Sequence, residues 1–107
     1  RATSAAPAVI KRVLDIGPLG MMVPNVRSVQ EARDVVAACR YGPDGFRGAA
    51  PALLRATSYG EQVADYERWM AEEFLLIIQI ESNEAVSDIE AITAVEGIDM
   101  LFIGPID

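Results

Sequence analysis

Apolar residues follow two kinds of spacing along the chain, and together these predict alternating helices and strands. Four stretches repeat apolar residues every three or four positions, which is the spacing of one helix face. They begin near Pro7, Ser28, Val63 and Asn83. Pro7 suits the first turn of a helix, and the sequence from Ser28 to Glu31 is typical of a capping box. We predict the last helix over residues 83–95, with Val86, Ile89, Ile92 and Val95 turned inward.

Three shorter stretches are continuously apolar instead of alternating, at residues 19–23, 74–78 and 100–103. A strand that is covered on both faces, as in a parallel sheet, explains such a run. Because these strands alternate with helices, the pattern predicts an α/β fold. Residues 40–60 break the pattern with Gly, Pro and small residues, and Leu53 and Leu54 there are expected to belong to a short helix.

The length limits how much of such a fold the chain can form. It has 107 residues, of which 51% are hydrophobic, whereas a complete (β/α)8 barrel usually has about 250 residues. Roughly half of a barrel would expose two sheet edges and apolar inner faces. We therefore expect residues 1–107 to be one segment of a barrel domain, incomplete at both ends, in a longer protein.

The charge and the cysteine content exclude some partners. The net charge is −7 with no basic cluster, which argues against nucleic acid and anionic membrane surfaces. No apolar run approaches the ~18 residues that span a bilayer. Cys39 is the only cysteine and falls on an apolar helix face, so a buried thiol in the cytoplasm is expected. Arg40 and Arg47 are expected to be structural and not catalytic.

Two carboxylates follow predicted strands at equivalent places. Glu81 follows the second strand and Asp107 follows the third. If these strands are neighbours, both acids lie at the carboxyl-terminal edge of the sheet, where ligands bind in barrels. Carboxylates brought close repel each other unless a proton or metal intervenes, and oxygen ligands suit Mg²⁺ or Mn²⁺. The alternative is that each acid merely caps a helix or lies solvated in a loop.

Several segments, spread over the whole chain, resemble the sequences of one protein family. These segments are Gly20-Met21-Met22-Val23-Pro24-Asn25-Val26, Arg40-Tyr41-Gly42-Pro43, Gly45-Phe46-Arg47-Gly48, Gln79-Ile80-Glu81 and Glu96-Gly97-Ile98-Asp99-Met100-Leu101-Phe102-Ile103-Gly104-Pro105-Ile106-Asp107. In this order they resemble the HpcH/HpaI aldolases, of the 4-hydroxy-2-oxoheptanedioate and 2-dehydro-3-deoxyglucarate aldolase type. Pro18, Asn25 and Gly42 differ from the residues that are commoner in this family. These differences concern the aldehyde preference and the loop shape, not metal binding.

The resemblance implies a metal-dependent aldolase. It would reversibly cleave 4-hydroxy-2-oxo acids to pyruvate and an aldehyde through a metal-bound pyruvate enolate. Glu81 and Asp107 would hold Mg²⁺, Mn²⁺ or Co²⁺, while Gln79, Gly104 and the backbone amide near Ile106 would contact the 2-oxo acid. A glycine at position 104 also makes physical sense, because it lets the backbone approach a ligand closely.

Two further residues match the family's catalytic positions. Arg1 matches an arginine that stabilises the negative oxygen formed during carbon–carbon cleavage, and Asp15 matches an acid that orients a catalytic histidine. The alternatives are an unremarkable terminal arginine and a helix-end acid facing solvent. The chain contains no histidine, so the family's general base must lie upstream.

Other functions remain open from the sequence. The same barrel and metal could serve an acyl-CoA lyase of the citrate lyase β-subunit type, or the chain could belong to a non-catalytic barrel protein. A Schiff-base mechanism lacks its nucleophile, because Lys11 is the only lysine and lies among helical residues. We further expect a homo-oligomer, a trimer or a hexamer.

Overall fold

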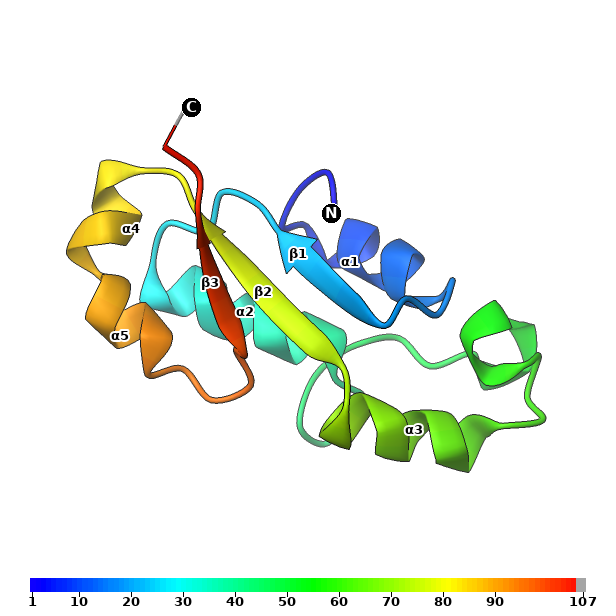
Figure 1. Cartoon of the computed structure of the whole chain (residues 1–107). Coiled ribbons are helices and arrows are strands. Elements are labelled where there is room, and N and C mark those ends of the chain that lie inside the picture. Colours follow the sequence, from blue (N-terminus) through cyan, green and yellow to red (C-terminus); the bar gives the residue numbers. More distant parts are fainter. Residues whose placement is uncertain (106–107) are drawn as a thin grey trace.

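The computed structural model describes residues 1–105 as a three-stranded parallel sheet with helices (Figure 1). The strands are β1 (Gly20–Val23), β2 (Leu75–Ile80) and β3 (Met100–Ile103), in the order β1-β2-β3. Val23 is paired with Ile78, and Ile80 is paired with Ile103. Because all three strands are parallel, their carboxyl ends lie at one edge. The α/β prediction is confirmed.

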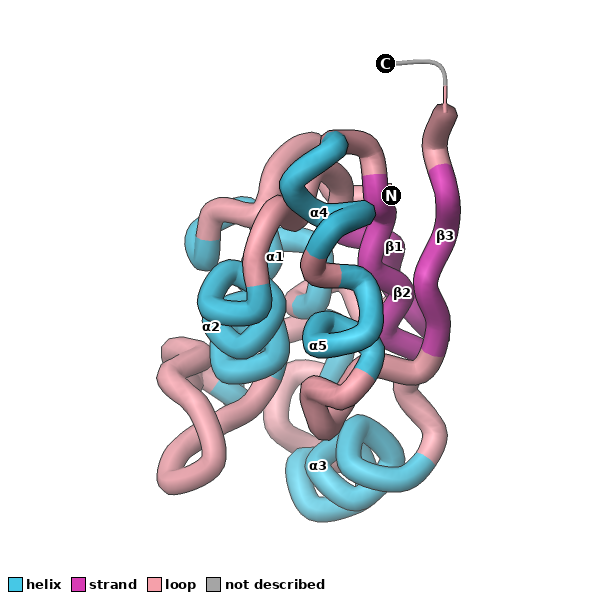
Figure 2. The backbone as a smooth tube through the Cα atoms, turned by 90° about the vertical axis from the view of Figure 1, so that its left-hand side faces the viewer, coloured by secondary structure: helices cyan, strands magenta, loops and turns pink. Residues whose placement is uncertain are grey.

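One helix precedes the first strand, and the others lie between the strands in the chain. The helices are α1 (Pro7–Leu14), α2 (Val29–Cys39), α3 (Val63–Glu72), α4 (Asn83–Ser87) and α5 (Ile89–Thr93), with 3-10 turns η1 (Pro51–Leu53) and η2 (Arg55–Thr57). Figure 2 shows α1, α2, α4 and α5 on one side of the sheet, while the strands form the other side. In the described part of the chain, the second face of the sheet therefore carries no helix. No helix in residues 1–105 combines the length and apolarity needed to cross a bilayer.

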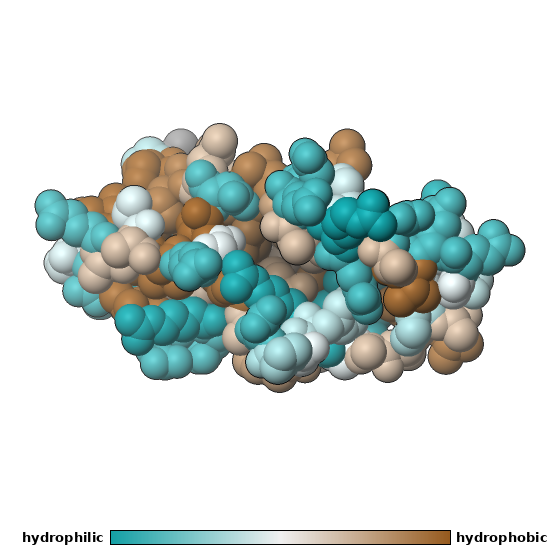
Figure 3. Space-filling view, turned by 90° about the horizontal axis from the view of Figure 1, so that it is seen from below, coloured by the Kyte–Doolittle hydropathy of each residue, from teal (hydrophilic) through white to brown (hydrophobic). Residues whose placement is uncertain are grey.

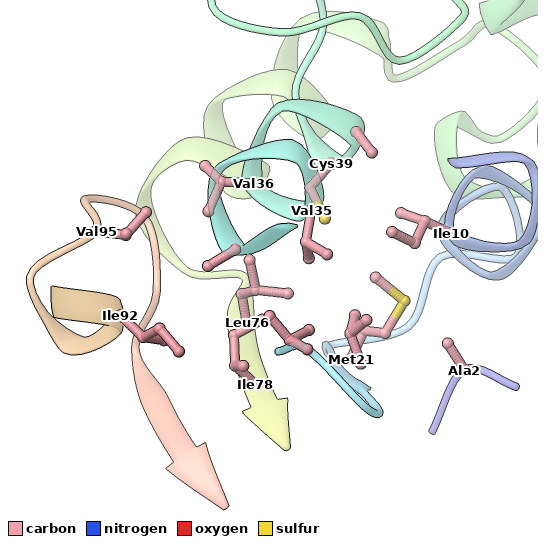
Figure 4. Packing of buried hydrophobic residues seen from close by; sticks show 14 of the residues in the cluster. Ala2, Ile10, Met21, Val35, Val36, Cys39, Leu76, Ile78, Ile92 and Val95 are labelled. Atoms are coloured by element: carbon pink, nitrogen blue, oxygen red, sulfur yellow. The ribbon is translucent and has the colours of Figure 1, made fainter. Parts of the chain in front are cut away.

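The core lies between α2 and the sheet. Val35 of α2 and Ile78 of β2 are both almost fully buried, and Ile10 of α1 and Ile92 of α5 close the two sides of this layer. Figure 4 shows these side chains converging from the helices toward β1 and β2. Burial of an aliphatic side chain stabilises a fold by about 1.5–3 kcal/mol, so this layer fixes the sheet against its helices.

The start of α2 follows the predicted capping box with one variation. The Ser28 hydroxyl accepts a hydrogen bond from the Glu31 amide at 3.2 Å. The Glu31 carboxylate reaches back to the amide of Arg27 at 2.8 Å, one residue before the cap. These bonds satisfy amides that a helix start otherwise leaves free. They also fix the turn that joins β1 to α2.

The predicted helix over residues 83–95 is wrong as a single element. The chain forms α4 and α5 with Asp88 between them, at φ −98° and ψ 9°. This backbone departs from helical values and turns the second segment relative to the first. Val86 was expected inside but is 54% exposed, whereas Ile92 is fully buried. The predicted short helix near Leu53 is confirmed by the 3-10 turn η1.

The last strand is less covered than predicted. Met100, Phe102 and Ile103 are 49%, 46% and 53% exposed, respectively. Within the described chain, β3 pairs on one side only, with β2, so no further strand covers its other edge. Figure 3 shows hydrophobic atoms at the surface mainly in the left-hand half of the lower face, while the right-hand half is more hydrophilic. Exposed apolar surface of this kind usually marks a contact face.

Candidate active site

The carboxyl ends of the strands bring together residues that are far apart in the sequence. The amide of Ala2 donates a hydrogen bond to the Met22 carbonyl at 2.9 Å, which places the chain start beside β1. The amide of Gly104 donates to the Ile80 carbonyl at 2.9 Å, which continues the pairing of β2 and β3 beyond their last residues. Arg1, Glu81 and Gly104 therefore share one edge of the sheet.

Arg1 and Gln79 meet directly at this edge. The Nη1 atom of Arg1 donates to Oε1 of Gln79 at 3.3 Å. The Gln79 side chain is on the end of β2, and the residue is only 8% exposed. Gln79 and Glu81 are two positions apart, and side chains two apart on an extended chain point the same way. The edge thus presents a cation, an amide and a carboxylate together.

Gly104 leaves room beside the two polar residues of β2. A Cβ atom at this position would lie 2.9 Å from Gln79 Nε2 and 3.3 Å from Glu81 Oε1. A distance below 3.0 Å is shorter than real Cβ contacts, so any side chain here would displace Gln79. The Gly104 backbone thus packs closely against these two side chains, and its predicted close approach to a ligand stays a prediction. Ile106 and Asp107 lie outside the described residues.

The turn after β1 completes the edge. The backbone amide of Asn25 donates to Glu81 Oε2 at 2.8 Å, and Asn25 has a positive φ of 55°. Its side-chain Oδ1 accepts from Arg27 Nε at 3.1 Å. Sequence reasoning assigned no site role to either residue. Asn25 lies two residues after the end of β1, much as Glu81 follows β2, and this position was the signal that could have found it.

These residues border a cleft of about 640 Å³ that is open to solvent. It is lined by Arg1, Thr3, Ser4, Ala5, Pro24, Asn25, Arg27, Glu31, Glu81 and Ser82. Two arginines and two glutamates therefore face one space, together with hydroxyl groups. Such a mixture of charges can bind a small acid through its carboxylate and a cation through its oxygens.

Asp15 does not lie in this cleft. It follows α1, close to the start of β1, whereas Glu81 follows the end of β2. Its Oδ1 atom accepts from Arg47 Nη2 at 3.0 Å, and its Oδ2 atom pairs with Lys11. The structure thus separates Asp15 from Arg1 and Glu81, and its expected contact with a histidine stays a prediction.

Arg47 is buried next to Asp15. The residue is 4% exposed, donates to the Tyr66 hydroxyl at 2.8 Å and lies 4.7 Å from the centre of the Tyr41 ring. Burial alone would lower the pKa of Arg47, but hydrogen bonds to Tyr66 and Asp15 raise it above its ordinary value. Arg47 was expected to cover the surface, but it is buried, because Asp15, Tyr66 and Tyr41 supply partners for its guanidinium group.

Cys39 is buried as predicted. The residue is 5% exposed and belongs to the core under α2. Burial raises the pKa of its thiol to about 12, although Arg47 and Arg40 act in the opposite direction. The side chain is therefore a neutral thiol near pH 7 and has no part in the cleft.

Glu81 is the candidate metal ligand among the described residues. Among residues 1–105, no group of three or more His, Cys, Asp or Glu side chains gathers around one point. Glu81 has one oxygen held by the Asn25 amide, and the residue lines the cleft that is open to solvent. A carboxylate held in this way, at a polar edge with room next to it, fits one ligand of a hydrated divalent cation.

Comparison with known proteins agrees with this arrangement. A match to the family described as HpcH/HpaI aldolase/citrate lyase covers residues 1–107. The chain belongs to this family. A hydroxypyruvate/pyruvate aldolase of Chromohalobacter salexigens is 46% identical over 107 residues, which is 100% of this chain and 42% of that protein. A 4-hydroxy-2-oxo-heptane-1,7-dioate aldolase of Salmonella arizonae is 44% identical over 101 residues, which is 94% of this chain and 38% of that protein.

A solved structure shows the same fold. The HpcH/HpaI aldolase/citrate lyase family protein of Burkholderia cenocepacia J2315 superposes with a TM-score of 0.88 and 34% identity, over 98% of this chain and 42% of that one. The predicted segment of a barrel is thereby confirmed. The chain spans about two fifths of the curated relatives described above, at 42% and 38% of their lengths.

Proposed function

We propose that the protein containing this chain is a divalent-metal-dependent aldolase that reversibly cleaves 4-hydroxy-2-oxo acids to pyruvate and an aldehyde. The observation that carries the proposal is the meeting of Arg1, Gln79 and Glu81 at the carboxyl edge of a parallel sheet. This is the edge at which barrel enzymes bind their substrates. The names of the aldolase relatives support the same reaction class.

Glu81 and Asp107 are the proposed metal ligands. The Glu81 carboxylate is oriented by the Asn25 amide and lines the cleft beside Arg1 and Asn25. Asp107 follows β3, the neighbour of β2, within a few residues of Gly104. Mg²⁺, Mn²⁺ or Co²⁺ bound there would act as a Lewis acid toward the 2-oxo group.

The remaining residues of the edge are proposed to bind and polarise the substrate. Gln79 and the backbone near Ile106 would donate hydrogen bonds to the 2-oxo acid. Arg1 lies within hydrogen-bond reach of Gln79, so its permanent positive charge can stabilise negative charge that develops on a neighbouring oxygen. A histidine, a residue that this chain lacks, would remove the proton of the 4-hydroxyl group. Asp15 is the proposed partner of that histidine, at a place outside the cleft that Arg1 and Glu81 line.

Substitution of the proposed metal ligand tests this function. Glu81→Gln keeps the size of the side chain but removes its charge, so Mn²⁺ binding and pyruvate formation should both be lost. Glu90→Gln is the matched control, because Glu90 is exposed on α5 and away from the cleft. Both variants would be titrated with Mn²⁺ and assayed in the intact protein. Full activity of Glu81→Gln would reject the proposed ligand.

We further propose that the protein is a cytoplasmic homo-oligomer. The single thiol, Cys39, is buried and unpaired in the described chain, which suits the reducing cytoplasm. Exposed apolar side chains such as Leu53 and Tyr59, at 78% and 68% exposure, would suit a homo-oligomer. A trimer or hexamer would be distinguished by sedimentation of the intact protein.

A further inference from the structure

We infer that Asn25 is a positioning residue, whose left-handed backbone orients the Glu81 carboxylate for a metal. The inference rests on the proposed function, since it concerns the same carboxylate. It starts from one contact: the Asn25 amide donates to Glu81 Oε2 at 2.8 Å, although 56 residues separate the two in the chain. A hydrogen bond from an amide to a charged carboxylate is short and strong.

The contact depends on an uncommon backbone conformation. Asn25 has a φ of 55°, in the left-handed region that most residues avoid. Asparagine tolerates this region better than other residues with a Cβ, while β-branched residues are strongly disfavoured there. The preceding Pro24 and the following Val26 are buried, so the turn is fixed on both sides. The conformation of residue 25 therefore determines where its amide points.

The rest of the turn holds this conformation in place. Asn25 Oδ1 accepts from Arg27 Nε at 3.1 Å, and the Arg27 amide donates to Glu31 Oε2 at 2.8 Å. Ser28 caps α2 directly afterwards. A chain of hydrogen bonds thus runs from the helix start to the carboxylate at the end of β2. The amide holds one Glu81 oxygen and leaves Oε1 on the side of Gly104.

Two roles of Asn25 can be separated by substitution. Asn25→Gly permits the positive φ and keeps the amide, but it removes the side-chain contact with Arg27. Asn25→Ala and Asn25→Val remove the same contact and also disfavour the positive φ, the valine more than the alanine. If the backbone of residue 25 matters, the glycine variant should bind the metal most tightly, the alanine variant less tightly and the valine variant least. A role of the Asn25 side chain predicts equal losses in all three.

The experiment is a titration of the intact, metal-free protein with Mn²⁺. Electron paramagnetic resonance measures the free Mn²⁺ at each step and so gives the affinity. Loss of an outer partner of a metal ligand usually weakens metal binding by about ten- to a hundredfold. We expect a loss of about this size for Asn25→Val, a smaller loss for Asn25→Ala and an affinity within about twofold of the original for Asn25→Gly. Asn83→Val, at the exposed first residue of α4, is the matched control and should bind normally.

The outcomes distinguish this inference from the proposed function. Circular dichroism and thermal unfolding would first show that the variants are folded. If Asn25→Val does not fold, the metal affinities of Asn25→Gly and Asn25→Ala still separate a backbone role from a side-chain role. Equal affinity of the glycine and alanine variants would overturn the role of Asn25 and leave the metal-dependent aldolase intact. Absence of Mn²⁺ binding by the unsubstituted protein would overturn both.

Discussion

Arg1 and Gln79 are joined by a hydrogen bond of 3.3 Å across 78 positions of the chain. This contact places a permanent cation next to the buried end of β2 and within the same cleft as Glu81. The next residue, Ala2, is only 1% exposed, and its amide is bonded to Met22 of β1. The sheet therefore holds Arg1 at the site.

Arg1→Lys should lower kcat much more than it changes metal affinity. Lysine keeps the charge but loses the planar group that bonds to Gln79 and to a developing oxyanion. Loss of one such donor usually lowers kcat by about 10²–10³-fold. Steady-state kinetics and Mn²⁺ titration of the same preparation would check this. An unchanged kcat would show that Arg1 is only a structural partner of Gln79.

Arg47→Ala should destabilise the fold without a direct effect on the cleft. The arginine side chain is fully buried and its partner Asp15 is 20% exposed. Asp15 keeps its pair with Lys11, but the buried Tyr66 hydroxyl and the Tyr41 ring lose their partner, so a loss of about 2–3 kcal/mol in unfolding free energy is expected. Urea unfolding of the intact protein would measure it.

Arg68→Ala is the control for this loss. Arg68 also pairs with an aspartate, Asp65, but their side chains are 64% and 75% exposed. Exposed pairs contribute under about 1 kcal/mol, because water and salt screen them. Equal losses for the two arginine variants would contradict the structural role given to burial of Arg47.

Cys39 should be unreactive in the folded protein and should make stability fall at high pH. Burial raises the pKa of its thiol from the ordinary value of 9.0 to about 12. Between these values the unfolded chain loses the proton and the folded chain keeps it, so the contribution is complete below pH 9 and is lost toward pH 12. Cys39→Ala would remove this part of the pH dependence.

Thiol titration checks the same point. An aromatic disulfide reagent at pH 8 should react slowly with the folded protein and quickly after urea is added. Rapid reaction without urea would show that the thiol is accessible, which would contradict its place under α2.

The sequence predicted the sheet well because its strands are continuously apolar. Apolar residues such as Ile78 and Ile80 are buried in the core, as their run of apolar neighbours predicts. The parallel direction of the strands follows from the helices that connect them. The break at Asp88 was missed because Val86, Ile89 and Ile92 have helical spacing on both sides of it. Spacing cannot show that one residue leaves helical geometry.

The site was predicted from strand ends, and the same rule shows what was overlooked. Glu81 was predicted because it directly follows an apolar strand, whereas Gln79 and Gly104 were predicted from the family resemblance. Asn25 lies in the same position after β1, but an amide side chain gave no chemical signal, and its contribution comes from its backbone. A backbone hydrogen bond between distant segments depends on tertiary contacts that residue types do not encode.

The central claim is that the carboxylates after the strands hold a metal needed for aldol cleavage. The most direct measurement is pyruvate release from a 4-hydroxy-2-oxo acid by the intact protein, with and without a chelator. Pyruvate release should stop when the metal is removed and return when Mn²⁺ or Mg²⁺ is added. Pyruvate release that continues unchanged in excess chelator would contradict it.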